Sequence, residues 1–86
     1  MTENEFIIRA ETRDRILKQV QQECVYQDAK WDDQNHSDGK WLIILIEELG
    51  EASESILEGN IEEGRHELIQ SAAVLIQWIY DIRRRN

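Results

Sequence analysis

Apolar residues recur at intervals of three and four over most of the chain. Side chains at these intervals share one face of a helix, so the pattern indicates amphipathic helices. It predicts three of them, over residues 12–29, 39–58 and 60–84. The apolar positions of the first helix are Ile16, Leu17, Val20 and Cys24, and those of the third are Leu68, Ile69, Ala72, Leu75, Ile76, Ile79 and Ile82.

The segments between these helices contain the residues that begin and end helices. Residues 30–38 are rich in Asp, Asn and Ser and predict a loop, in which Ser37 or Asp38 caps the second helix. Gly59 stands where a helix commonly ends in a left-handed residue, and Asn60 can cap the third helix. Because this connection is so short, we expect the second and third helices to form an antiparallel hairpin.

The chain of 86 residues has no proline and only four glycines, which favours a single all-α domain. Residues 1–11 carry mixed charge around three apolar residues and predict a short arm that packs on a neighbour. The second helix is apolar on more than one side, because Trp41 and Ile43 cannot face the same way as Leu42 and Leu49. We therefore expect a helical bundle, built from an N-terminal helix and a long hairpin, that is completed by oligomerisation into a homodimer or homotetramer.

The charge of the chain limits its partners. The formal net charge is −8, and the only concentrated positive patch is the arginine run at 83–85, which suits the negative end of a helix. We therefore expect no binding to nucleic acid. The N-terminus lacks a basic signal region, and the longest apolar run, residues 41–46, is too short for a membrane span, so we expect a cytoplasmic protein without membrane contact. The single cysteine, Cys24, is interpreted as a core residue.

An acidic cluster follows directly on the apolar run of the second helix. Like charges at helical spacing repel, so the helix itself gains nothing from this cluster. In a hairpin turning at 59–60, Glu48 and Glu51 come level with Glu67 and Gln70. Three carboxylates and one amide oxygen in one groove suit Mg²⁺, or Mn²⁺, with water sites left for substrate phosphates.

These positions resemble a known family. Glu47-Glu48-x-x-Glu51, followed by Glu67-x-x-Gln70, is similar to the EExxE…ExxD signature of the MazG-like all-α nucleoside triphosphate pyrophosphohydrolases. The flanks, QDAKWDDQNHSDGKW and ELIQSAAVLIQWI, resemble short single-domain members found in phages and mobile elements. The resemblance covers roughly residues 13–82. It implies an oligomeric helical bundle that cleaves a nucleoside triphosphate to the monophosphate and pyrophosphate.

The resemblance also implies roles for single residues. The metal ligands would be Glu48, Glu51, Glu67 and Gln70, with Glu47 holding a ligand or a water and Glu47 and Glu48 serving the catalytic step. Gln70 stands where the family pattern has Asp, and because its amide brings no charge, we expect weaker metal binding. The loop would supply the substrate contacts through Lys30, Trp31, Gln34, Asn35 and His36.

Other interpretations remain. A non-catalytic helical oligomer, degenerate at Gln70, would bind nucleotide or a protein partner without turnover, and an acidic helical adaptor would bind no small ligand. Two metal motifs fail on spacing. His66-Glu67 begins like a zinc-protease HExxH but lacks the second histidine, and a di-iron bundle needs Glu-x-x-His on each of two helices, whereas only Glu63 and His66 provide one.

Overall fold

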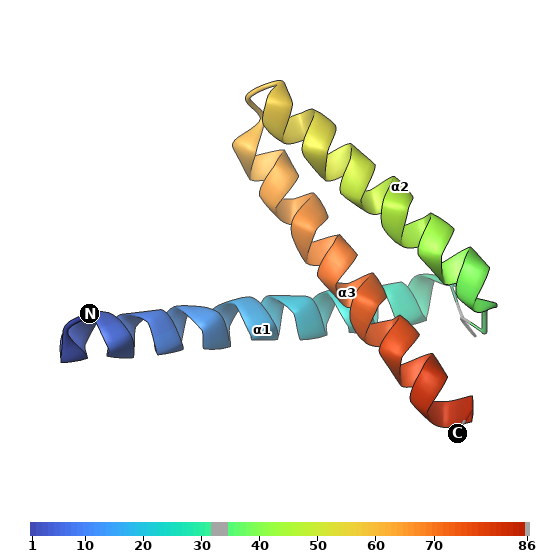
Figure 1. Cartoon of the computed structure of the whole chain (residues 1–86), viewed down its shortest axis with the longest axis horizontal. Helices are drawn as coiled ribbons and strands as arrows, with labels where there is room; N and C mark the ends of the chain where they lie inside the picture. Colours follow the sequence, from blue (N-terminus) through green and yellow to red (C-terminus); the bar gives the residue numbers. More distant parts are fainter. Residues whose placement is uncertain (32–34, 86) are drawn as a thin grey trace.

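The computed structural model describes residues 1–31 and 35–85, and these contain three helices and no strand. The helices are α1 (Glu3–Trp31), α2 (Asp38–Leu57) and α3 (Ile61–Arg85). Figure 1 shows α2 and α3 as the two arms of a hairpin, with α1 crossing α3 and its N-terminal half projecting away. Because α3 packs against both other helices, it is the central element. The expected all-α class and the hairpin are confirmed.

The first helix is longer than the sequence pattern predicts. Residues 3–11, for which we expected an arm, are helical and continuous with the rest of α1. The helix starts after Thr2, whose Oγ1 accepts a hydrogen bond from the Glu5 N–H at 3.2 Å. No glycine or proline interrupts the segment that follows, so the helix continues through it. Residues 1–19 are exposed except for half-buried Ala10, which means that this half of α1 has almost no packing within the chain.

The caps that position α2 and the hairpin turn are those expected from the sequence. Ser37 caps α2, with its side chain accepting a hydrogen bond from the Lys40 N–H at 3.2 Å. Gly59 has a φ of 87°, a conformation that glycine adopts without a steric penalty. The Asn60 N–H bonds to the Ser55 carbonyl at 2.8 Å and the Gly59 N–H to the Ile56 carbonyl at 3.1 Å. These two bonds form a Schellman motif, which closes α2 and reverses the chain into α3.

The core of the single chain is made mainly of small side chains. Val20 and Cys24 of α1 pack on Ala73 of α3, with partly buried Ile69 and Ala72 around them. Burial raises the pKa of the Cys24 thiol, and the nearby Asp28 raises it further, so Cys24 is a neutral core residue as expected.

Two reciprocal Trp–Asp–Arg groups join α2 to α3 at the end away from the turn. In the first group, the buried Trp41 indole donates to Asp81 Oδ2 at 3.0 Å, and Arg84 donates to Oδ1 at 2.8 Å. In the second, the Trp78 indole donates to Asp38 Oδ1 at 2.9 Å, and Arg85 donates to the same oxygen at 2.6 Å. Each helix thus contributes one tryptophan and one aspartate, and we call this pair of groups the tryptophan clamp.

Many large apolar side chains remain on the surface of the single chain. They include much of the α3 stripe and several residues of α1 and α2: Phe6, Ile8, Leu17, Leu42, Ile43, Ile46, Leu49, Leu68, Leu75, Ile76, Ile79 and Ile82. Within residues 1–31 and 35–85 no helix is both long enough and apolar enough to span a membrane.

Candidate functional site

The turn and the contacts beside it set the level at which α2 meets α3. Gly64 of α3 is buried against Ile56 and Ala52 of α2. One helical turn further along α3, Glu67 is only 8% exposed, and its Oε1 accepts a hydrogen bond from Ser55 Oγ at 2.5 Å. Ser55 therefore holds the Glu67 carboxylate on the face of α3 that meets α2.

The Glu48 carboxylate is the centre of the acidic cluster. Its Oε2 is buried and has no hydrogen-bond partner among the described residues. Burial raises the pKa of Glu48, and the charges of four other glutamates raise it further. In order of their effect, these are Glu51, Glu23, Glu67 and Glu47. Carboxylates from all three helices thus act on one buried oxygen, which is costly unless a cation or a proton compensates it.

The predicted metal ligands are brought together only in part. Glu48, Glu51 and Glu67 lie close enough for their charges to interact, as the hairpin register predicts. Gln70 instead has its amide Nε2 at 3.4 Å from His66 Nε2. In the part of the chain that the structure describes, no group of three or more His, Cys, Asp or Glu side chains is arranged to hold a metal ion. The four-ligand set therefore stays a prediction that requires side-chain rotation.

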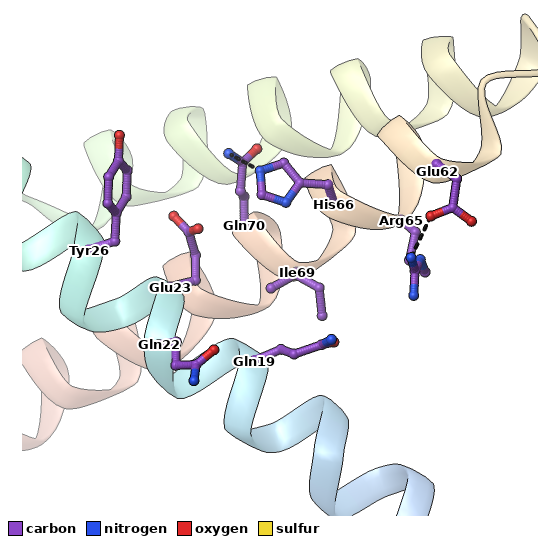
Figure 2. A pocket seen from close by; sticks show the side chains of 9 residues that line it. All are labelled: Gln19, Gln22, Glu23, Tyr26, Glu62, Arg65, His66, Ile69 and Gln70. Carbon is purple, nitrogen blue, oxygen red and sulfur yellow. Dashed lines mark hydrogen bonds and ion pairs between the residues drawn. The ribbon is translucent and has the colours of Figure 1, made fainter.

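A cavity of about 500 Å³ lies between α1 and α3, beside the acidic cluster. Figure 2 shows the side chains around it. Helix α1 contributes Gln19, Gln22, Glu23 and Tyr26, and helix α3 contributes Glu62, Arg65, His66, Ile69 and Gln70. Arg65 and Glu62 form an ion pair with each other at the outer edge. Glu23 lines this cavity, and its charge is also one of those that raise the pKa of Glu48.

A buried glutamine holds Glu23 in place. Gln27 is 2% exposed, and its Nε2 donates to Glu23 Oε2 at 3.1 Å and to the Gln70 carbonyl at 3.4 Å. Its Oε1 accepts a hydrogen bond from Gln77 Nε2 at 2.6 Å. Both ends of the Gln27 amide are therefore satisfied, and the network ties α1 to α3 where the cavity meets the cluster.

The predicted substrate contacts of the loop have different surroundings. Lys30 and Trp31 end α1 and are exposed, with Lys30 Nζ 4.8 Å from the Trp31 ring centroid and 5.8 Å from that of Tyr26. His36 packs edge-on against Trp41 with ring centroids 4.8 Å apart, so packing accounts for it. Asn35 is exposed, and Gln34 lies outside the described residues.

Three residues of the site were not identified from the sequence. Glu23 and Gln27 lie on the first helix, where they match an ordinary polar face, and their spacing of four residues was the only available signal. Ser55 lies in an acidic stretch that is typical of a solvated surface, but it shares the level of Glu67 in the hairpin.

Comparisons of the chain with protein-family models, with curated proteins and with solved structures found no match.

Proposed function

We propose that the chain is a Mg²⁺-dependent nucleoside triphosphate pyrophosphohydrolase of the MazG-like type. The observation that carries the proposal is the buried, unpartnered Oε2 of Glu48 among four further carboxylates. An unpaired buried charge is normally eliminated or compensated. A divalent cation would compensate this one, and the oxygens around it are hard donors of the kind Mg²⁺ prefers.

The residues present fit such an ion in donor chemistry. Glu48, Glu51 and Glu67 would hold it, with the Gln70 amide oxygen as the neutral fourth donor after its side chain turns away from His66. When bound, the ion would gather triphosphate oxygens and lower the pKa of an attacking water. Glu47 is exposed on the same helix and would position that water or accept its proton. Ser55 would keep Glu67 oriented through its hydrogen bond.

Oligomerisation is part of the proposal. Large apolar side chains on all three helices are exposed in the single chain, for example Leu17 at 61%, Ile43 at 56% and Ile79 at 54%. Exposed apolar surface of this extent is typical of a subunit interface. A homodimer or homotetramer would bury it and complete the bundle.

The decisive experiment is pyrophosphate release from a panel of nucleoside and deoxynucleoside triphosphates, with Mg²⁺ and with EDTA. We expect release only with the metal, and we expect Glu51→Gln and Glu67→Gln each to lose it while keeping helical content and oligomer size. The matched control is Glu54→Gln, since Glu54 is exposed on the same helix and is not among the charges that act on Glu48. Wild-type rates in both site variants would refute the proposed site.

A non-catalytic oligomer that binds nucleotide or a protein partner is the second candidate. The contact of Gln70 with His66 favours it, because the side-chain amide expected to be the fourth ligand contacts a histidine on its own helix instead. Such a protein would release no pyrophosphate with any triphosphate, and its binding would be the same with Mg²⁺ and with EDTA.

A further inference from the structure

We propose that the cavity between α1 and α3 binds the nucleoside part of the substrate. This inference rests on the proposed function and assigns the cavity residues, rather than the loop alone, to base and sugar recognition. The cavity volume of about 500 Å³ is within the usual range for small-molecule sites, about 300–1,000 Å³. Two features support a nucleoside as the occupant: the hydrogen-bonding groups of the cavity and its position next to the carboxylates.

The lining of the cavity suits an uncharged, hydrogen-bonding group. Gln19 and Gln22 offer amide donors and acceptors, and neither makes a side-chain hydrogen bond to another described residue. Base edges carry donors and acceptors side by side, and an amide can match both. Tyr26 adds an aromatic surface on which a base can stack. An apolar peptide would leave these amides without partners, and we therefore do not favour one.

The charge of the cavity also favours a neutral moiety over a polyphosphate. Arg65 is paired with Glu62, so this pair brings no net positive charge to the cavity. Glu23, fixed by Gln27, presents a carboxylate that can accept hydrogen bonds from sugar hydroxyls or from exocyclic amino groups. The same carboxylate would repel phosphates that are not accompanied by a cation.

The position of Glu23 indicates the orientation in which the substrate would bind. Because Glu23 lines the cavity and its charge acts on Glu48, a ligand with its nucleoside in the cavity would extend its phosphates past Glu23 towards the acidic cluster. Lys30 Nζ lies 5.8 Å from the ring centroid of Tyr26, a lining residue, and would place its ammonium group close to such a ligand. The cavity and the cluster would then bind the two chemically different halves of one molecule.

The test uses nucleosides without phosphate, so that neither the metal nor the carboxylate cluster is needed for binding. The full-length protein in EDTA is titrated with the common ribonucleosides and deoxyribonucleosides, and the side-chain amide signals of glutamine are followed by NMR. We expect shifts at Gln19 and Gln22, and a Kd for the best nucleoside that is raised about 3- to 10-fold by Gln22→Leu, the usual effect of one lost hydrogen bond. Gln21→Leu is the matched control, because Gln21 is exposed on the same helix and does not line the cavity.

The outcomes separate this inference from the proposed function. The inference would be overturned if no nucleoside bound, or if the wild type, Gln22→Leu and Gln21→Leu bound it with equal affinity. If the protein releases pyrophosphate, an unchanged KM in Gln22→Leu would also overturn it. Binding that depends on Gln22 in a protein without turnover would support the cavity assignment and refute only the hydrolase.

Discussion

Replacing Gly64 with alanine tests the contact on which the register of the hairpin depends. A Cβ at this position would lie 2.5 Å from Ile56 Cγ1 and 3.2 Å from Ile56 Cδ1. Alanine in a helix interior is favoured over glycine by about 1 kcal/mol. Overpacking of a close contact costs about 1–3 kcal/mol. We therefore expect Gly64→Ala to change the free energy of unfolding by about 0 to −2 kcal/mol.

The Ile56 side chain determines whether Gly64→Ala stabilises or destabilises the protein. A β-branched residue in a helix has one strongly preferred χ1 rotamer, so Cγ1 cannot rotate away freely. Ile56→Ala removes the two closest atoms; the third nearest atom, the Ala52 carbonyl oxygen, lies at an ordinary contact distance of 3.4 Å. In that background we expect Gly64→Ala to stabilise the protein by about 1 kcal/mol, its helix-propensity gain alone. The two substitutions should thus be coupled by about 1–3 kcal/mol.

Urea unfolding of the four proteins of this double-mutant cycle gives the coupling. All are compared at one protein concentration, because oligomerisation makes apparent stability concentration-dependent. Gly50→Ala is the control: nothing lies within 4 Å of its Cβ, so we expect about 1 kcal/mol of stabilisation with or without Ile56. If Gly64→Ala behaved like Gly50→Ala in both backgrounds, the two helices would not meet at this level, and the assignment of Glu67 to the cluster would fail with it.

Two pH predictions of opposite sign follow from the buried carboxylates. Burial, and then the acidic neighbours, raise the pKa of Glu48 in the folded protein. Above this raised pKa the ionised Glu48 destabilises the metal-free fold. The destabilisation is lost as the pH falls to the ordinary glutamate pKa of about 4.3, because Glu48 is then protonated in the folded protein. Glu48→Gln should therefore stabilise the protein in EDTA at neutral pH but not near pH 4, and it should abolish any rise in Tm with Mg²⁺. An equal gain in stability at both pH values would refute the burial argument. Hydrogen bonds from the Trp41 indole, and then from Arg84, lower the pKa of Asp81 in the folded protein. Ionised Asp81 therefore stabilises the fold above the ordinary aspartate pKa, and this stabilisation is lost as the pH falls through the lowered pKa. Asp81→Asn should lower stability at neutral pH and flatten the acid limb of the urea-midpoint profile, whereas an unchanged acid limb would contradict this role.

Local signals in the sequence predicted the hairpin and the level at which three of its glutamates meet. Ser37 and Gly59 act through bonds to residues a few positions away, so a short stretch of sequence is enough to recognise them. Once the turn is placed, the antiparallel arrangement brings Glu48, Glu51 and Glu67 to one level without further information.

The contribution of α1 could not be predicted in the same way. Which of its polar residues meet the cluster depends on where α1 crosses α3, and that crossing is set by packing between residues about 50 positions apart, such as Cys24 and Ala73. Helical periodicity gives the faces of a helix but not the partner of each face. The same limit applies to Gln70, whose level in the hairpin was predictable but whose contact with His66 was not.

The tryptophan clamp and the Schellman turn hold α2 and α3 together at both ends of the hairpin. The acidic cluster lies between these two supports, so the helices there have little freedom to separate. Capture of an ion at Glu48 would then require rotation of individual side chains and not the microsecond-to-millisecond movement of whole helices. The exposed side chains of Glu47 and Glu51 would rotate within picoseconds to nanoseconds. The arrangement would let the site change its coordination quickly while its backbone stays stiff.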